Sequence, residues 1–527
     1  MVDSQPRPKR AVSSKRARNG IRIVLFQRVS YPFGKNTMQL LTSIYRTWRR
    51  NPFKTLIVDD YRKWKGLDLQ VASWHVAKHI NTDKPHVAVL LPTSGMFPVS
   101  LTAIWSLGKT IVPLNYLLTK EEIDFIIADS GVDTVITVDA MVDMIGGLPD
   151  GIKAIKLDKM SFGGLPPIRK SVKCESDMLA ALLYTSGTSG KPKGVMLSAG
   201  NLLANVDQCK RWVSFAKNDV FLGLLPQFHS FGFTATTLIP SAIGATAVYC
   251  AKFNPRKVLD LIRKNKPTVM LAIPSMFNAI LNSKSAKASD FDSIRFALSG
   301  GEALPDAVYE GFKNRLDVTI LEGYGLTETA PVTNLCRPEE HRRGTVGKPV
   351  YDVHERIVDE NENELPAGQD GEIRITGPNI MQGYFNLEEE TKNAFDSKGY
   401  FKTGDMGQLD EDGFLYITGR IKEMLIIAGE NVFPREIEEV LMNHPDVIAA
   451  GVVGRSDVAR GEVAVAFVEL AEGATFDEQK LRSWCRETIA QFKVPKSIYA
   501  LDEMPRNPTG KIMRRELTKL VEKETVN

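Results

Sequence analysis

The chain has 527 residues, of which 43% are apolar and 25% are charged. This composition is typical of globular proteins and excludes a wholly disordered chain, a collagen and a disulfide-stapled miniprotein. The net charge of +4 is unevenly distributed, because the first 58 residues carry +12 and the remainder therefore carries −8. Because the remainder of the chain is acidic, we do not expect it to bind nucleic acid.

Residues 1–37 are rich in Lys and Arg and lack an apolar period, which predicts a basic, disordered extension. Met38 is an alternative translation start. Three interpretations of this segment are open: a dispensable extension, a targeting segment, and peripheral contact with an anionic membrane surface.

Short apolar runs then alternate with helical stretches. An amphipathic helix is predicted from apolar residues at helical spacing, namely Leu40, Leu41, Ile44, Tyr45 and Trp48. The runs His86–Pro92 and Thr134–Val138 are typical of buried strands, and Phe97–Leu107 and Glu121–Ala128 have helical character. This alternation predicts βαβ units around parallel sheets.

Three predicted strands in the middle of the chain end in small or turn residues. They are Thr268–Ile273, Arg295–Leu298 and Val318–Leu321, and the second is followed by Gly300 and Gly301. Ligands of open α/β sheets bind beyond the carboxyl ends of strands, and glycine lets the backbone approach a ligand closely. We expect these strand ends to line one pocket.

The pattern changes after about residue 350. Ile357–Ile375 and Gly413–Ile427 are typical of alternating strands, and Phe433–Leu441 begins a helix with Pro434 at its first position. The last hundred residues are typical of a small α+β domain.

The five cysteines are far apart and form no CxxC pair, which indicates free thiols in a reducing, cytoplasmic compartment. His75 and His79 share a helix face, but the glutamate of a zinc protease motif is missing, so we interpret the pair as structural.

The strongest chemical signal is the loop Tyr184–Val195, with the sequence YTSGTSGKPKGV. Its hydroxyls and unobstructed backbone N–H groups suit phosphate oxygens, and Lys191 and Lys193 add positive charge. It is not a Walker A loop, because Pro192 stands where Ser or Thr should follow the lysine.

This loop resembles the signature of the adenylate-forming superfamily, which contains acyl-CoA synthetases, adenylation domains and beetle luciferases. Five further segments follow in the family's order: Pro226–Gly232, Glu322–Glu328, Tyr400–Asp405, Gly419–Lys422 and Pro508–Lys511. The resemblance covers about residues 40–520. It implies an α/β N-terminal domain over 38–420, with parallel βαβ sheets and a small β-barrel-like part, and a mobile α+β C-terminal domain over 421–527.

The resemblance also implies the reaction and its residues. ATP converts a carboxylate into an acyl adenylate with release of pyrophosphate, and the acyl group then passes to CoA. The implied catalytic residues are Lys511, Glu328, Thr185 and His229, with Glu328 and Thr185 as Mg²⁺ ligands. The implied nucleotide contacts are Thr185, Ser186, Gly187, Thr188, Ser189, Gly190, Lys191, Lys193, Gly301, Glu302, Ala303, Glu322, Gly323, Tyr324, Gly325, Thr327, Asp405, Arg420 and Lys511.

Three further assignments rest on the family pattern. His229, Phe231 and Phe233 would border the acyl pocket, and Lys422 would be the hinge for domain rotation. The CoA contacts would be Ala428, Gly429, Glu430 and Arg460.

The favoured function is an acyl-CoA synthetase acting on medium- or long-chain fatty acids. One alternative acceptor is the phosphopantetheine thiol of a carrier protein acting in trans. A different class of function is a non-catalytic binding protein that acts through the basic N-terminal segment. The presence of Lys511, Glu328 and Asp405 argues against this alternative, because a non-catalytic protein need not keep them.

Overall fold

The computed structural model describes residues 39–164, 166–168, 175–185, 191–457, 460–506 and 510–524. The predicted basic extension and the loop residues Ser186, Gly187, Thr188, Ser189 and Gly190 lie outside these ranges. We call residues 39–420 the large domain and residues 425–524 the small domain.

The large domain contains a nine-stranded sheet whose central strands are parallel. In spatial order the strands are β15 (Lys348–Pro349), β14 (Val332–Leu335), β13 (Ile320–Gly325), β12 (Phe296–Ser299), β11 (Val269–Ala272), β9 (Val220–Gly223), β10 (Thr246–Tyr249), β1 (Thr55–Val58) and β2 (Lys63–Lys65). The strands β11, β12 and β13 are adjacent, so their carboxyl ends meet at one edge.

A second, seven-stranded sheet is also largely parallel. Its strands are β18 (Gly383–Tyr384), β8 (Lys193–Ser198), β7 (Leu179–Thr185), β4 (Thr110–Pro113), β3 (His86–Leu90), β5 (Thr134–Thr137) and β6 (Lys153–Lys156). The phosphate-loop motif therefore begins at the end of β7 and finishes in β8, which run antiparallel.

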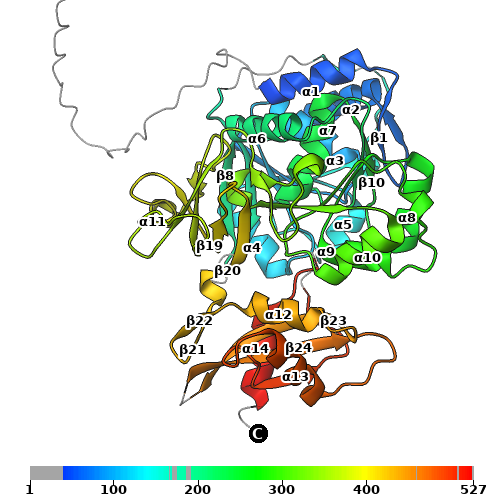
Figure 1. Ribbon diagram of the computed structural model, residues 1–527. Coiled ribbons are helices and arrows are strands. Elements are labelled where there is room, and N and C mark those ends of the chain that lie inside the picture. The colour runs from blue at the N-terminus through cyan, green and yellow to red at the C-terminus, as the bar shows by residue number, and fades with distance from the viewer. Residues whose placement is uncertain are drawn as a thin grey trace, which may run out of the picture. The chain divides into compact units, whose positions relative to one another are not determined.

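Helices cover both faces of these sheets, as Figure 1 shows for the labelled elements. The central layer consists of α1 (Gln39–Arg50), α2 (Gly66–His79), α3 (Met96–Ser106), α6 (Ala199–Trp212) and α7 (Ile239–Ile243). The outer layers are α4 (Lys120–Ser130) and α5 (Asp139–Met144) on one sheet, and α8 (Pro255–Asn265), α9 (Pro274–Leu281) and α10 (Asp306–Leu316) on the other. Parallel sheets need both faces covered, because their strands are apolar on both sides.

The predicted barrel-like part is a four-stranded antiparallel sheet. Its strands are β16 (His354–Val358), β17 (Gly371–Thr376), β19 (Phe401–Leu409) and β20 (Leu415–Arg420), and α11 (Glu388–Asn393) lies between β18 and β19 in the chain. The ladder between β19 and β20 pairs Asp405 with Arg420, two predicted nucleotide contacts.

The small domain has a five-stranded sheet and three helices, seen in orange and red in Figure 1. The strands are β22 (Glu430–Val432), β21 (Leu425–Ile427), β24 (Gly461–Leu470), β23 (Val447–Asp457) and β25 (Ser497–Ala500), and the helices are α12 (Pro434–Met442), α13 (Glu478–Thr488) and α14 (Arg514–Glu524). The two-domain α/β and α+β fold class predicted from the sequence is confirmed.

The local predictions hold where periodicity is strong. All five apolar residues predicted for the first helix are buried in α1, and Pro434 opens α12 as expected. One predicted strand end was wrong. We expected the third strand to end at Leu321, but β13 continues to Gly325, because β14 pairs with it antiparallel and extends its ladder.

An ion pair between the buried Asp219 and the half-exposed Arg295 joins the amino-terminal ends of β9 and β12. Asp219 accepts hydrogen bonds from Arg295 Nε at 2.8 Å and Nη2 at 2.6 Å, and also from Thr268 Oγ1 at 2.8 Å and Ala216 N at 2.8 Å. Burial alone would raise the pKa of Asp219, but the hydrogen bonds from Arg295 and Ala216 outweigh it and lower the pKa.

We expect Asp219→Asn to reduce the free energy of unfolding by about 1–3 kcal/mol at pH 7. Because the folded-state pKa is lowered, this contribution is present above the ordinary carboxyl pKa of about 3.9 and is lost as the pH falls below it. Urea unfolding at pH 7 and pH 3 measures the difference. The control is Asp260→Asn, whose side chain is 77% exposed beside Arg263. A difference between wild type and Asp219→Asn that persists unchanged at pH 3 would contradict the assignment.

Candidate active site

Glycines shape the edge where β11, β12 and β13 end. A Cβ atom at Gly300 would lie 3.2 Å from the Phe231 ring, and Gly301 has a φ of +86°, which favours glycine. A Cβ at Gly325 would lie 2.0 Å from the carbonyl oxygen of Pro331, so no side chain fits there. The three strand ends are adjacent at this edge, where the backbone packs closely; that they line one pocket stays a prediction.

Three of the predicted nucleotide contacts form one connected group. Tyr324 Oη donates to Asp405 Oδ2 at 2.6 Å, and Arg420 Nε lies 2.9 Å from Asp405 Oδ1. Asp405 is buried, and Arg420 is half-exposed. Burial and the adjacent carboxylate raise the pKa of Tyr324 well above its ordinary value, so the hydroxyl remains a hydrogen-bond donor.

Glu328 has a partner that the sequence did not indicate. Tyr384 Oη donates to Glu328 Oε1 at 2.9 Å, and the Lys193 ammonium lies 5.4 Å from the centre of the Tyr384 ring. Lys193 faces Thr185 across the β7–β8 ladder. Burial raises the pKa of Glu328. One carboxylate, one hydroxyl and one lysine therefore gather beside the phosphate-loop motif.

Lys511 lies against the same strand ends. At the preceding residue, a Cβ on Gly510 would meet Ser275 Oγ at 2.7 Å and Ile273 Cδ1 at 2.9 Å. Burial lowers the pKa of Lys511, and the Glu302 carboxylate opposes that shift. Burial raises the pKa of Glu302, and Lys511 opposes it in turn. The small domain thus brings its lysine to the edge where Gly300 and Gly301 lie.

His229 is a neutral imidazole. Burial and the nearby positive charge of Lys511 lower the pKa of His229 to about 4. Its Nδ1 accepts a hydrogen bond from the Phe231 backbone N at 3.3 Å, which leaves the ring proton on Nε2. Phe231 is half-buried beside Gly300, whereas Phe233 is fully buried and packs edge-to-face on Phe97 within the core.

The remaining predicted nucleotide contacts have differing surroundings. Glu322 is buried and forms an ion pair with Arg343, so its side chain is already used within the protein. Thr327 Oγ1 donates to Ser230 Oγ at 3.2 Å. The half-buried Ala303 follows Glu302, and a Cβ at Gly323 would lie 2.8 Å from the Leu335 side chain. Lys191 lies 5.6 Å from the Phe125 ring centre.

The residues predicted for the hinge and for CoA lie at the start of the small domain. Lys422 is exposed in a short 3₁₀ turn, Ile421–Glu423. Ala428 and Gly429 both have positive φ, of +54° and +87°, and form the tip of the β21–β22 hairpin. The Ala428 N donates to the Arg460 carbonyl oxygen at 2.8 Å, so the structure brings the four predicted CoA residues together on exposed backbone.

Two residues that the sequence did not indicate hold predicted site residues in place. Tyr384 is hydrogen-bonded to Glu328, and Arg343 forms an ion pair with Glu322. Tyr384 lies in an unremarkable Gly-Tyr pair, and Arg343 follows another arginine in what resembles a solvated loop. Neither carries a local signal, because each partner is distant in the sequence.

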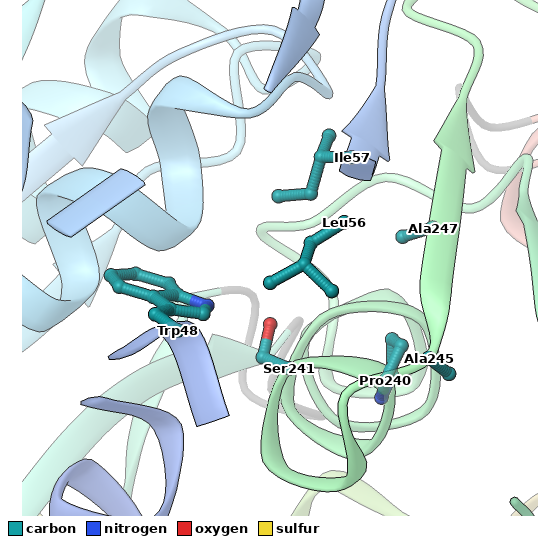
Figure 2. A pocket seen from close by; sticks show the side chains of 7 residues that line it. All are labelled: Trp48, Leu56, Ile57, Pro240, Ser241, Ala245 and Ala247. Carbon is teal, nitrogen blue, oxygen red and sulfur yellow. The ribbon is translucent and has the colours of Figure 1, made fainter. Parts of the chain in front are cut away.

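A small internal cavity lies elsewhere in the fold. Figure 2 shows it between Trp48 of α1, Leu56 and Ile57 of β1, and Pro240 of α7. Its volume of about 10 Å³ has room for one water at most, and no predicted site residue lines it. It is a packing defect rather than a substrate site.

Comparisons with known proteins agree with this geometry. The family model described as AMP-binding enzyme matches residues 44–385, and the AMP-binding enzyme C-terminal domain matches residues 436–511. The chain is 33% identical over 493 residues to a long-chain-fatty-acid–CoA ligase of Bacillus subtilis, covering 84% of this chain and 86% of that one. It is 32% identical over 453 residues to a sulfoacetate–CoA ligase of Cupriavidus necator, covering 82% and 86%.

A solved structure is similar as well. The O-succinylbenzoate coenzyme A synthetase of Bacillus subtilis in complex with ATP and a magnesium ion matches with a TM-score of 0.81 and 29% identity, covering 90% of this chain and 99% of that one. The fold and site thus define an adenylate-forming enzyme. The chain belongs to the AMP-binding enzyme family, in its acyl-CoA synthetase branch, which confirms the resemblance and the enzyme class predicted from the motifs.

Proposed function

We propose that this enzyme activates a medium- or long-chain fatty acid and transfers the acyl group to CoA. The observation that carries the proposal is the convergence of Lys511, His229 and Glu302 with the Asp405–Tyr324–Arg420 group around the ends of β11–β13. The fatty-acid assignment is supported by the similarity to a fatty-acid–CoA ligase and by the apolar Phe231 beside Gly300.

The first half-reaction joins two anions. A carboxylate oxygen of the acid attacks the α-phosphorus of ATP, the bond from that phosphorus to the β-phosphate oxygen breaks, and pyrophosphate leaves. Lys511 stabilises the charge that builds up between the carboxylate and the α-phosphate. Asp405 accepts hydrogen bonds from the ribose hydroxyls, and Tyr324 lies against the base. Because His229 is neutral, it adds no charge beside Lys511.

Magnesium fits the residues that are present. No group of three or more His, Cys, Asp or Glu side chains in the described part of the chain could hold a metal ion by itself. Glu328 and Thr185 would supply two oxygen ligands, and substrate phosphates the others, which is how Mg²⁺ is commonly held in nucleotide enzymes. When bound, the ion would neutralise phosphate charge.

In the second half-reaction the sulfur of CoA attacks the acyl carbonyl carbon, the bond to AMP breaks, and the thiol proton passes to solvent. This step uses a second domain arrangement reached by rotation at Lys422, with Ala428, Gly429, Glu430 and Arg460 near the CoA.

None of the described helices is long and apolar enough to cross a membrane. The role of the basic extension as a membrane contact is a separate proposal.

The test is an assay of pyrophosphate release and CoA consumption with short-, medium- and long-chain acids, an aromatic acid and sulfoacetate. Preference for the medium- or long-chain acids by at least about tenfold in kcat/KM supports the assignment, since tenfold corresponds to about two buried methylenes. Preference for an aromatic or sulfonated acid would overturn the substrate class and leave the CoA-ligase class intact. Pyrophosphate release without CoA consumption would overturn CoA as the acceptor and favour the phosphopantetheine thiol of a carrier protein.

The phosphate loop gives a further prediction. Thr185→Ala and Lys193→Ala should each raise the KM for MgATP by about tenfold, since each removes a hydrogen bond to charged phosphate oxygens. Initial rates at varied MgATP measure this, with thermal melting as a folding control. The matched control is Lys264→Ala, an exposed lysine on α8. Wild-type KM values in both loop variants would contradict the assignment.

A further inference from the structure

A short connection joins the two domains. The last strand of the large domain, β20, ends at Arg420, and the first strand of the small domain, β21, begins at Leu425. The residues between them form the 3₁₀ turn Ile421–Glu423 and Met424, and the Met424 N donates to the Ile421 carbonyl oxygen at 3.3 Å. The two ends of this turn are held by different domains.

The large domain holds the first end. Arg420 pairs with Asp405 in the β19–β20 ladder, and its Nε also lies 2.9 Å from Asp405 Oδ1. Asp405 is buried and is further held by Tyr324. Backbone and side chain together therefore fix Arg420 to the large domain.

The small domain holds the second end. Arg514 Nη1 lies 3.0 Å from Glu423 Oε2, and its Nη2 lies 2.7 Å from Glu438 Oε2. Glu438 is 7% exposed on α12, and its Oε1 accepts a hydrogen bond from the Val452 N of β23 at 2.7 Å. The fork of one guanidinium thus joins the turn to α12, β23 and α14.

Between these two attachments are Ile421 and Lys422. Ile421 is 40% exposed and Lys422 is exposed, and neither side chain forms an ion pair or hydrogen bond with a described residue. A domain rotation has to be absorbed by φ/ψ changes at residues that both domains leave unconstrained. Only these two meet that condition within the turn.

We propose that Glu423 and Arg514 are positioning residues that make Glu423 part of the small domain and confine the rotation to Ile421 and Lys422. The inference rests on the proposed two-step function. Arg514 is three residues beyond Lys511, so the same ion-pair cluster also holds the base of the segment that carries the lysine. A two-residue hinge restricts the small domain to few orientations. A longer hinge would allow more orientations, and Lys511 would then be held less firmly at the strand ends of the large domain.

The test is a rescue experiment on both half-reactions. Lys422→Pro fixes one φ of the two-residue hinge, so thioester formation should fall by at least about tenfold more than adenylation. Adding Glu423→Gln releases the turn from Arg514 and lets residues 423 and 424 rotate. The double variant should recover thioester formation by about tenfold, the size of coupling seen between residues that share one backbone shift.

The matched control is Glu436→Gln in the Lys422→Pro background. Glu436 also forms an ion pair within the small domain, with Lys493 at 2.7 Å against 3.0 Å for Glu423 and Arg514, but it does not touch the turn. This control should recover nothing. Equal thioester rates in Lys422→Pro with and without Glu423→Gln would overturn the inference, as would a Lys422→Pro variant that keeps both half-reactions.

Limited trypsin digestion tests the same inference with a readout that does not depend on enzymatic activity. Arg514→Lys keeps one positive charge but cannot reach both glutamates in the forked geometry, and it leaves the sequence around Lys422 unchanged. Cleavage after Lys422 should become severalfold faster, with other cleavage sites and the melting temperature little changed. Unchanged cleavage after Lys422 would overturn the inference even in a protein that adenylates normally. Absence of adenylation in the wild type would instead remove the proposed function and leave this structural test valid.

Discussion

Replacing Lys511 with alanine is expected to slow acyl-adenylate formation by roughly 10²–10³, because in the proposed mechanism the ammonium stabilises charge that develops mainly in the transition state. Lys511 is held at the ends of β11 and β12, beside Glu302 and His229. When the same variant receives preformed acyl adenylate, it should make thioester at a rate within about threefold of wild type. In the proposed mechanism Lys511 does not contact the transition state of thioester formation, so its removal should change that rate little. Pyrophosphate release and thioester formation are measured separately.

The matched control is Lys519→Ala, which removes a half-exposed lysine of α14 that pairs with Glu516. It should leave both half-reactions near wild type. Equal loss of both half-reactions in Lys511→Ala would contradict the two-arrangement proposal, and an unchanged adenylation rate would remove Lys511 from the catalytic residues.

Glu328→Gln is expected to lower kcat/KM for MgATP by about 10², because the neutral amide is a poor ligand for a hard cation and leaves phosphate charge less neutralised. Raising the Mg²⁺ concentration should recover part of the loss. Tyr384→Phe removes only the 2.9 Å hydrogen bond that orients Glu328 Oε1, so we expect a loss of about three- to tenfold. The rate is measured as a function of free Mg²⁺ at fixed ATP.

The exposed Glu310 of α10 provides the control, and Glu310→Gln should not shift the Mg²⁺ dependence. If Glu328→Gln and wild type respond identically to Mg²⁺, Glu328 is not a metal ligand. If Tyr384→Phe loses as much as Glu328→Gln, the tyrosine acts on substrate directly rather than by orienting the carboxylate.

Much of the site could be predicted from the sequence because its chemistry is carried by short contiguous motifs. A loop of hydroxyls, glycines and lysines offers donors and positive charge that suit phosphate oxygens, and the Pro-x-Gly-Lys segment resembles the family's C-terminal lysine motif. Helix α1 was equally accessible, since burial of Leu40, Ile44 and Trp48 follows from helical periodicity alone. Recognition of the family supplied the order of the motifs and the reaction.

The sequence by itself determined the residue types of the site, the alternation of strands and helices, and the change from βαβ units to an α+β domain, because each is written in local spacing. Only the tertiary structure decided which partner each charged group has. Tyr324 meets Asp405 across 81 residues, and Tyr384 meets Glu328 across 56. These contacts depend on strand order and register, which bring distant segments together and leave no trace in local periodicity. The attachment of Glu423 to Arg514 has the same origin, since the packing of α14 on β23 sets it.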